Sequence, residues 1–355
     1  MRTEIFVIDP LHIENQENEL KNAAEIIKRG GLVAFPTETV YGLGGDGTNP
    51  KAAESIYAAK GRPSDNPLII HISNPVDAER YTYTSELYYK LADRFMPGPL
   101  TVVMNAKDTV PLQTRGGLST VAVRCPINPI ARRLIELSGC PIAAPSANLS
   151  GSPSPTSARH VIDDMNGRID AIIDGGDCEI GLESTIVKIE NDETLTLLRP
   201  GKITVEELTC VAPVSVASAV IAELAEGEVA LSPGMKYRHY APKSPLVLVD
   251  GDLDSFLVLV KESNEDNIAI LCFSDDLENL RENLPGVDVF VLGARNNINE
   301  QASHLFAILR EADKHCYDRI YAPVPSKNGM GLALYNRMIR AAAHTIINLR
   351  QERNG

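Results

Sequence analysis

The residues best suited to chemistry lie in short runs that follow predicted strands. The run PTETVYGLG at 36–44 follows a buried strand predicted at 32–35 and supplies hydroxyl and backbone N–H groups. Such groups converge at strand ends in α/β proteins, where ligands bind. Gly42, Gly44 and Gly47 also satisfy G-x-G-x-x-G, but five residues separate the strand-closing proline from the first glycine, which argues against a dinucleotide loop. A plain turn is the alternative interpretation of these glycines.

Cations gather at the ends of other predicted elements. Lys60 and Arg62 flank Gly61 at the end of a helix, His71 lies on the next strand, and Arg124 ends a strand at 120–124. The two cations near the helix end could simply complement its C-terminus. Alternatively they bind an anion, for which a lysine point charge and an arginine fork are well suited. His71 is as readily structural as functional.

Three more polar runs complete the set of candidate binding segments. They are APSANLSG at 144–151, GLEST at 181–185 and LRPG at 198–201. Ser146 lacks the G-x-S-x-G setting of a nucleophile elbow, so we predict a hydrogen-bonding role for it. The sequence has no Walker A motif and no H-E-x-x-H or H-x-x-E-H run, so any ATP must bind to another scaffold.

Charge and composition favour a small anionic ligand over a nucleic-acid surface. The chain of 355 residues has a net charge of −13, which disfavours non-specific binding of nucleic acid. Between residues 60 and 133, however, ten Lys/Arg oppose six Asp/Glu. An ordinary solvated face is the alternative reading of this local excess.

The cellular setting predicted from the sequence is the cytoplasm. No apolar run approaches the roughly 18 residues that span a bilayer, and the N-terminus does not resemble a secretory signal. The six cysteines are scattered without C-x-x-C pairs, which favours reduced thiols over a zinc site or disulfide framework.

The elements that must position these residues predict two α/β domains. Length and composition fit two globular cores. In the first, strands are predicted at 68–72, 100–104, 120–124, 141–144, 171–173, 185–189 and 194–198, and helices at 18–29, 48–61, 85–95, 128–138 and 156–165. In the second, strands are predicted at 246–249, 268–273, 287–292 and 319–322, and helices at 252–262, 299–313 and 332–349. We therefore predict a domain at 1–210, a linker at 211–245 and a smaller Rossmann-like domain at 246–355.

The ordered set of motifs resembles the threonylcarbamoyl-AMP synthase family in its two-domain form, with a YrdC-like catalytic domain. The matching runs are PTETVYGLG (36–44), KGRPSDNPL (60–68), FMPGPLT (95–101), VAVRCP (121–126), APSANLSG (144–151), GLESTIV (181–187), LRPG (198–201) and the linker run SPGMKYRHYAP (232–242). The resemblance implies a twisted mixed sheet around a deep electropositive cavity. It also implies ATP, L-threonine and bicarbonate as substrates, Mg²⁺ accompanying ATP, and a tRNA-modifying transferase complex that receives the product.

The resemblance also assigns residues. For ATP it implies Lys60, Ser64, Thr120, Ser146, Ser154 and Arg199, with Tyr237 from the linker; for L-threonine it implies Thr37, His71, Arg124, Ala144 and Ser184. Lys60 and Arg62 are the expected catalytic cations, and the remaining signature residues are Asn66, Asn148, Arg238 and His239. No protein ligand for a metal and no protein nucleophile are implied.

These cations suit a reaction in which carboxylate, carbamate and triphosphate must meet, because such anions repel one another in water. Two rival functions are an RNA-binding regulator that uses the same concave surface, and carbamoyl transfer in hydrogenase maturation, where a YrdC-like domain also appears. An RNA-binding regulator is disfavoured by the acidity of both domains. Carbamoyl transfer in hydrogenase maturation involves additional domains and paired cysteines that this chain lacks.

Overall fold

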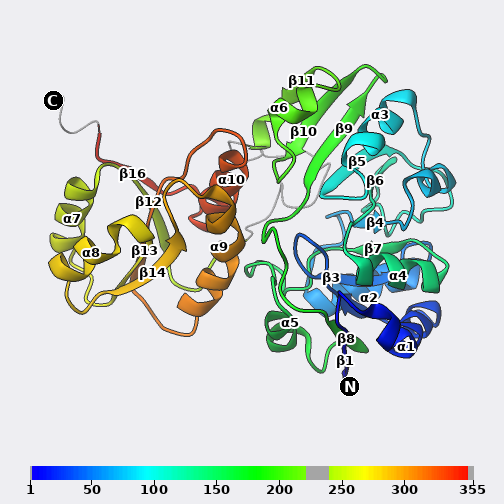
Figure 1. Ribbon diagram of the computed structural model, residues 1–355, viewed down its shortest axis with the longest axis horizontal. Coiled ribbons are helices and arrows are strands. Elements are labelled where there is room, and N and C mark those ends of the chain that lie inside the picture. The colour runs from blue at the N-terminus through cyan, green and yellow to red at the C-terminus, as the bar shows by residue number, and fades with distance from the viewer. Residues whose placement is uncertain (1, 221–239, 351–355) are drawn as a thin grey trace. The chain divides into compact units, whose positions relative to one another are not determined.

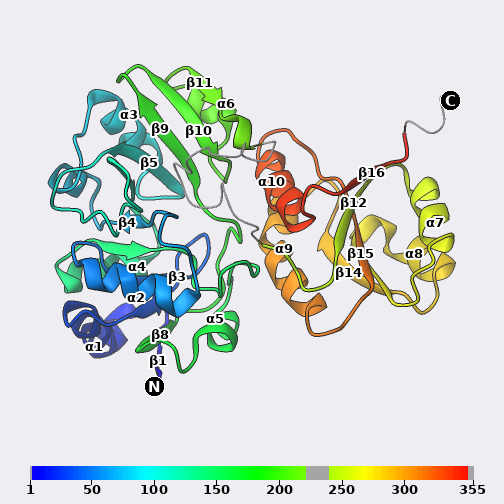
Figure 2. The same cartoon turned by 180° about the vertical axis from the view of Figure 1, so that it is seen from behind.

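The computed structural model describes residues 2–220 and 240–350. The chain divides into two compact units, Met1–Ser150 with Ser154–Tyr237, and Gly151–Pro153 with Arg238–Gly355. Figure 1 labels their helices and strands, and Figure 2 shows the same elements from behind.

The first unit is built on a mixed sheet in the order β1-β8-β2-β3-β7-β4-β6-β5-β9-β10-β11. Its strands are β1 (Glu4–Val7), β2 (Val33–Phe35), β3 (Gly42–Asp46), β4 (Ile69–His71), β5 (Leu100–Asn105), β6 (Thr120–Arg124), β7 (Ile142–Ala144), β8 (Ala171–Asp174), β9 (Thr185–Glu190), β10 (Thr194–Arg199) and β11 (Val214–Val216). Its α-helices are α1 (Glu17–Lys28), α2 (Pro50–Lys60), α3 (Glu86–Phe95), α4 (Pro129–Ser138), α5 (Ala158–Met165) and α6 (Val205–Thr209), with 3₁₀ turns η1 (Ile13–Gln16), η2 (Pro75–Arg80) and η3 (Ser218–Val220).

Local sequence accounts for the helix that leads into the cation run. Asn49 caps α2 by accepting a hydrogen bond from the backbone N–H of Lys51, and Pro50 occupies the first turn. Gly61 ends the helix in the left-handed conformation, with φ of 62°. The predicted helix at 48–61 is thereby confirmed, and its last residue is Lys60.

The glycine-rich run after Tyr41 is not the turn that its composition suggested. It forms β3, which pairs antiparallel with β2 so that Phe35 lies opposite Gly42. A Cβ added to Gly44 would lie 2.6 Å from the Ile142 side chain and 2.7 Å from the Phe35 ring. The glycines therefore let two neighbouring strands pack closely, and no glycine loop runs from a strand into a helix here.

The second unit is a parallel sheet in the order β14-β13-β15-β12-β16 with helices on both faces. Its strands are β12 (Leu246–Asp250), β13 (Ile268–Phe273), β14 (Asp288–Gly293), β15 (Arg319–Pro323) and β16 (Ile346–Asn348). Its helices are α7 (Leu253–Lys261), α8 (Leu277–Asn283), α9 (Ile298–Ala312) and α10 (Gly331–Ala341), with the 3₁₀ turn η4 (Ser274–Asp276). Figure 1 shows α7 and α8 on one face of the sheet and α9 and α10 on the other, which confirms a Rossmann-like α/β architecture.

Two predictions at the domain edges need correction. The helix predicted at 332–349 ends at Ala341, because Ala343 and His344 adopt positive φ values of 46° and 60° and turn the chain into β16. The predicted linker at 211–245 begins inside the first unit, where β11 pairs with β10. The β-branched residues Val214 and Val216 allow this short strand to extend the sheet edge.

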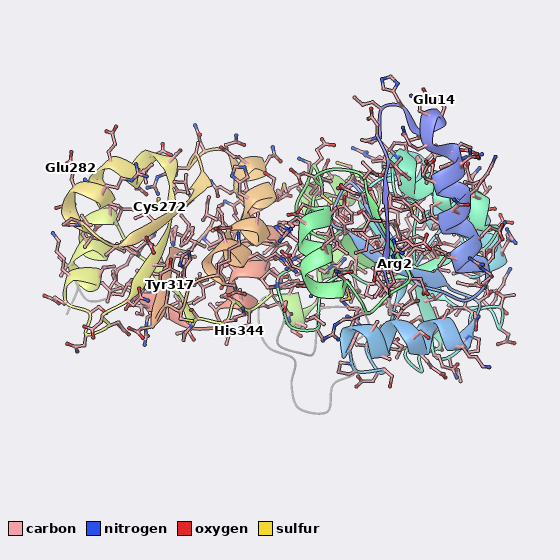
Figure 3. All side chains as sticks on the ribbon, turned by 90° about the horizontal axis from the view of Figure 1, so that it is seen from below. Arg2, Glu14, Cys272, Glu282, Tyr317 and His344 are labelled. Atoms are coloured by element: carbon pink, nitrogen blue, oxygen red, sulfur yellow. The ribbon has the colours of Figure 1, made fainter. Side chains whose placement is uncertain are left out.

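Charged and apolar side chains separate in the expected way within each unit. Figure 3 shows Glu14 and Glu282 at the surface, while Cys272 lies on the sheet of the second unit. Among the described residues, no helix has the length and apolarity needed to cross a membrane.

Candidate active site

Strand register brings two predicted site residues and one further hydroxyl together near the end of β6. In the sheet, His71 of β4 pairs with Arg124 of β6, and Thr101 of β5 pairs with Arg124 from the other side. All three residues are buried. The strand ends thus place a cation, an imidazole and a hydroxyl at one edge of the sheet, where α/β proteins bind ligands.

A buried ion pair lies at the centre of this cluster. The Nη2 of Arg124 donates to Oε1 of Glu38 at 2.7 Å, and each side chain is 5% exposed. Glu38 comes from the loop after β2, next to Thr37, whose hydroxyl donates to the carbonyl of Val40 at 2.6 Å. The PTETVYGLG run therefore carries both a predicted threonine contact, Thr37, and the partner of another, Arg124.

His71 is uncharged in this setting. Burial and then the neighbouring Arg124 charge lower the pKa of His71 to about 3. Its Nδ1 lies 3.2 Å from the carbonyl of Ile142, and its ring meets the Phe35 ring edge-on at 6.1 Å. The Nδ1 therefore donates to that carbonyl, which leaves Nε2 as a hydrogen-bond acceptor.

A second set of contacts joins the start of β9 to the end of β10. The guanidinium of Arg199 donates to the carbonyl and to the hydroxyl of Ser184, each at 3.1 Å. The hydroxyls of Ser184 and Thr101 lie 2.8 Å apart. Beside them, the Ser154 hydroxyl donates to Glu183 at 2.5 Å. Arg199 and Ser184, predicted from two separate motifs, therefore form one cluster with the β5 strand, and Ser154, predicted outside the quoted runs, lies beside it.

Lys60 reaches a different loop, the one that follows β7. Its ammonium group donates to the carbonyl of Ser146 at 2.5 Å and to the carbonyl of Asn148. The Ser146 hydroxyl in turn donates to Oδ1 of Asn148 at 2.5 Å. Carbonyl groups orient an ammonium without carrying a compensating charge, so these contacts fix the position of a buried cation.

Two of these groups, the Glu38–Arg124 pair and the contacts of Lys60, lie beside the same loop, residues 37–41. The backbone N–H of Ala147 donates to the carbonyl of Tyr41 at 2.8 Å, and the N–H of Tyr41 donates to Pro155 at 2.9 Å. Residues 37–41 thus run from the Glu38–Arg124 pair to the segment that holds Lys60. The motifs that the sequence analysis grouped as one site are brought together around this loop.

The remaining predicted residues have different surroundings. Arg62 is buried and donates through Nε and Nη2 to the carbonyls of Asn66 and Pro67. Ala144 is the buried last residue of β7, whereas Ser64 is exposed and Thr120 is half-buried. Which of these residues contact ATP or threonine stays a prediction, and so does the electropositive cavity.

The predicted linker contacts Tyr237, Arg238 and His239 lie outside the described residues. The first described residue after them is Tyr240, whose ring stacks on that of Phe306 of α9 with centroids 5.2 Å apart. The backbone N–H of Lys243 donates to Asp313 at 2.7 Å. The C-terminal end of the cationic and aromatic segment, residues 236–243, therefore packs within the second unit.

Sequence reasoning missed Glu38, Thr101 and Glu183 as members of the site. Each lies within a run that was recognised, but none was assigned a role. A signal was present for Glu38, which is the one acidic residue in an otherwise uncharged run at 36–45. A buried carboxylate needs a partner, and a strand-ending arginine is an obvious candidate.

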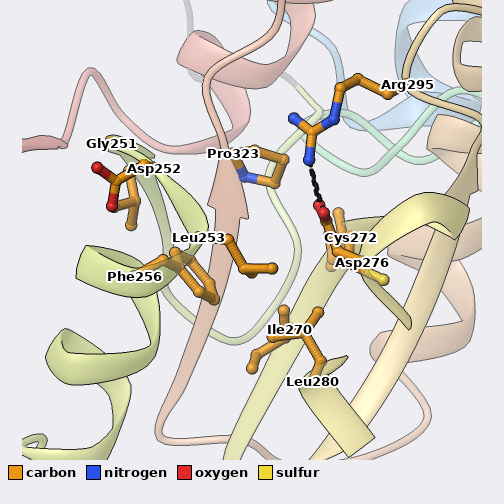
Figure 4. A pocket seen from close by; sticks show the side chains of 12 residues that line it. Gly251, Asp252, Leu253, Phe256, Ile270, Cys272, Asp276, Leu280, Arg295 and Pro323 are labelled. Carbon is orange, nitrogen blue, oxygen red and sulfur yellow. Dashed lines mark hydrogen bonds and ion pairs between the residues drawn. The ribbon is translucent and has the colours of Figure 1, made fainter. Parts of the chain in front are cut away.

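The second unit contains a separate cavity of about 90 Å³ at the carboxyl ends of β12 and β13. Figure 4 shows an apolar floor that includes Phe256 and Ile270 beneath a charged rim. At the rim, Arg295 donates to both oxygens of Asp276 at 2.6–2.7 Å. Asp252 accepts from the N–H of Ser255 as the cap of α7, so each rim carboxylate already has a partner.

Family models and known relatives match nearly the whole chain. A family model described as "Telomere recombination" (Sua5_yciO_yrdC) matches residues 25–201, and one described as "Threonylcarbamoyl-AMP synthase, C-terminal domain" matches residues 203–343. The threonylcarbamoyl-AMP synthase of Pyrococcus abyssi is 43% identical over 346 residues, covering 94% of this chain and 97% of that protein. The chain belongs to the threonylcarbamoyl-AMP synthase (Sua5) family. The Bacillus subtilis member of this family is 40% identical, covering 98% of this chain and 100% of that protein.

Structural similarity extends over both units of this Sua5-family chain. A crystal structure of P. abyssi Sua5 complexed with L-threonine matches with a TM-score of 0.87 and 41% identity, covering 98% of this chain and 100% of that one. The family resemblance read from the ordered motifs is confirmed by these matches, together with the two-domain α/β architecture.

Proposed function

We propose that the chain is an L-threonylcarbamoyladenylate synthase, which makes threonylcarbamoyl-AMP and pyrophosphate from L-threonine, bicarbonate and ATP. Nearly full-length similarity to threonylcarbamoyl-AMP synthases supports the activity. The observation that carries the proposal in this molecule is the buried arrangement of Lys60, Arg124 and Arg199 around the loop after β2. Three buried cations beside one loop suit a reaction whose participants are all anionic.

At the amino-acid end, Arg124 would bind the carboxylate of threonine. An arginine fork matches a carboxylate, and the strand register fixes it beside the hydroxyls of Thr101 and Ser184. His71, held neutral by burial, adds a hydrogen-bonding group without adding charge. Recognition by fixed polar groups in a dry pocket discriminates strongly between amino acids with and without a hydroxyl.

At the nucleotide end, Lys60 and Arg62 would face the triphosphate. The threonine nitrogen first gains a carboxylate from bicarbonate, which gives a carbamate and releases water. A carbamate oxygen then bonds to the α-phosphorus while the bond from that phosphorus to the α–β bridging oxygen breaks, so AMP is transferred and pyrophosphate leaves. Positioning and charge stabilisation suffice for such a step, and no protein nucleophile takes part.

Mg²⁺ would enter with ATP and be held by its phosphates and by water. Among the described residues, no three His, Cys, Asp or Glu side chains are grouped as a metal site. Magnesium bound to nucleotide substrates commonly keeps several waters and takes few protein ligands. The ion would neutralise phosphate charge next to Lys60 and Arg62.

The product would pass to a transferase complex that modifies tRNA, and we place the reaction in the cytoplasm. The segment with Tyr237, Arg238 and His239 would close over the nucleotide and shield the labile mixed anhydride from water.

One experiment tests the substrate assignment most broadly. ATP consumption should be measured with each of the twenty amino acids, with and without bicarbonate. We expect consumption well above background with L-threonine and bicarbonate together. Preference for another amino acid, or turnover that does not depend on bicarbonate, would overturn the proposed function.

A further inference from the structure

The Glu38–Arg124 pair has one buried acceptor atom and one buried donor atom that no described group satisfies. Oε1 of Glu38 and Nη2 of Arg124 bind each other, but Oε2 of Glu38 and Nε of Arg124 are buried with no hydrogen-bond partner among the described residues. Buried polar atoms in folded proteins nearly always have a partner, and a charged group without one is costly to bury. Two such atoms on one ion pair therefore point to a ligand that supplies both an acceptor and a donor.

The residues around the pair narrow the chemistry of that ligand. Glu38 and Arg124 are each about 95% buried, and His71 beside Arg124 is neutral. Burial, with a contribution from the Glu38 charge, also raises the pKa of the nearby Cys178 thiol, so it is uncharged. With His71 and Cys178 uncharged, the ion pair itself contributes one positive and one negative charge here. A ligand that matches it has one negative and one positive group a few ångströms apart.

The amino-acid group of an α-amino acid has this form. Its carboxylate accepts hydrogen bonds and its ammonium donates them, and both are attached to one carbon atom. Laid antiparallel to the ion pair, the carboxylate meets Arg124 and the ammonium meets Glu38, so all four charges alternate. A phosphate or a simple carboxylate would satisfy the arginine but would be repelled by Glu38.

We propose that Glu38 binds the α-amine of L-threonine while Arg124 binds the α-carboxylate, so that the ion pair recognises the amino-acid group as a unit. This inference rests on the proposed function for the identity of the amino acid. It makes Glu38 a substrate-binding residue that holds the nitrogen which becomes the carbamate. A purely structural Glu38 would act only by keeping Arg124 in place.

Comparing ligands with and without the amine on the wild type and on a Glu38 variant separates direct amine binding from positioning of Arg124. Calorimetry should compare L-threonine with (R)-3-hydroxybutanoate, which is threonine without its α-amine, on the wild type and on Glu38→Gln. Losing a charge-assisted contact should weaken L-threonine binding about 10- to 100-fold. Binding of 3-hydroxybutanoate should not weaken and should become tighter, because it has no amine to lose and its carboxylate is no longer repelled by Glu38. L-threoninol, which lacks the carboxylate, should be as sensitive to Glu38→Gln as threonine is.

Two outcomes would overturn the inference. Equal weakening of L-threonine and 3-hydroxybutanoate would show that Glu38 acts only through Arg124. Unchanged threonine binding would show that water or another part of the chain satisfies Oε2. Glu17→Gln is the matched control, because Glu17 forms an ion pair with Arg133 elsewhere in the same unit and should leave both affinities unchanged.

The remaining controls separate this inference from the proposed function. If Glu38→Gln fails to fold, Glu38→Asp keeps the charge but withdraws it by one methylene, and the same selective loss for L-threonine is expected. If the wild type prefers another amino acid, the proposed function fails, and the same comparison is run with that amino acid and its deaminated form. If the wild type binds no amino acid, both claims are overturned.

Discussion

The two units of the molecule bury charge in different places. In the first unit, buried Lys60, Arg124 and Arg199 each end a helix or a strand. In the second unit, buried Arg337 and Arg340 lie within a single helix, α10. Arg337 donates to its neighbour Asn336 at 3.0 Å and lies over the Tyr240 ring.

Under the proposed function, the cations that end elements in the first unit would serve a ligand. Element ends carry free backbone groups and converge from distant parts of the sequence, so cations there can meet around one substrate. Cations along one helix are placed by that helix and stabilise its surroundings. We therefore expect variants in the first unit to affect catalysis far more than variants at the charged rim in the second.

The largest expected effect comes from substitutions of Lys60 and Arg124 in the first unit. Lys60→Ala should lower kcat/KM by about 10²-fold or more, because a charge-assisted contact in a dry site is lost. Arg124→Lys should lower it by about 10-fold or more, since lysine keeps the charge but not the fork. Steady-state kinetics of pyrophosphate release would measure both effects. Near-normal values would show that these residues are not in the active site.

Arg124→Ala is a poorer test than its position at a strand end suggests. A residue that closes a strand is often replaceable without loss of the fold, but Arg124 and Glu38 are each 5% exposed and pair with each other. Removing one partner leaves a buried charge uncompensated, which commonly costs about 3–5 kcal/mol. Circular dichroism and unfolding curves should therefore accompany any kinetic result for this variant.

The next largest effect is expected in the cationic and aromatic segment, residues 236–243. The double variant Tyr237→Ala, Arg238→Ala should lose most of the threonylcarbamoyl-AMP activity, because an aromatic ring and an arginine suit contact with a nucleotide. Lys243→Ala is the matched control, since the Lys243 ammonium contacts the Asp313 carbonyl in the second unit. Product formation is the measurement, and full activity in the double variant would reduce the segment to a tether.

A smaller effect should appear in the pH dependence of stability. Burial lowers the native pKa of His71 to about 3, below its usual 6.5, so the unfolded chain binds more protons between these values. Stability contributed by the neutral ring is present above about pH 6.5 and is lost as the pH falls. Between pH 7.5 and 5.5 this should remove about 1.4 kcal/mol of unfolding free energy.

His71→Asn should make that pH dependence shallower, since an amide can still donate to the Ile142 carbonyl but does not titrate. Urea unfolding at the two pH values measures the difference. Exposed His12 provides the control, because His12→Asn should leave the slope nearly unchanged. An identical slope for wild type and His71→Asn would show that His71 is not neutral in the folded state.

The smallest effect is expected at the rim of the cavity in the second unit. The side chain of Arg295 is 54% exposed and pairs with Asp276, an arrangement that contributes about 1 kcal/mol or less. Arg295→Ala should therefore change kcat/KM by less than about 2-fold. A loss comparable to that of Lys60→Ala would break the contrast between the two units.

Sequence patterns predicted the elements that have local signals. Asn49, Pro50 and Gly61 mark the ends of α2, and their roles can be read directly from residue type. The strand β3 could not be read this way, because its glycines are explained by Phe35 and Ile142 on neighbouring strands. The end of α10 was missed for a similar reason, since alanine and histidine at 343–344 carry no strong stop signal.

The same division applies to the candidate site. Motif order identified Thr37, His71, Arg124 and Ser184, but the partner of Arg124 is 86 residues away in the chain. Only the register of β4, β5 and β6 decides which groups face that arginine. Residue types thus indicate the chemistry, whereas long-range pairing determines which atoms are left to bind a ligand.

The most direct test of the central claim is the substrate dependence of pyrophosphate release. Release from ATP should be followed with L-threonine and bicarbonate together, with each alone and with neither. The account predicts rapid release only when both are present, in step with the formation of threonylcarbamoyl-AMP. Equal release in the absence of both substrates would contradict it.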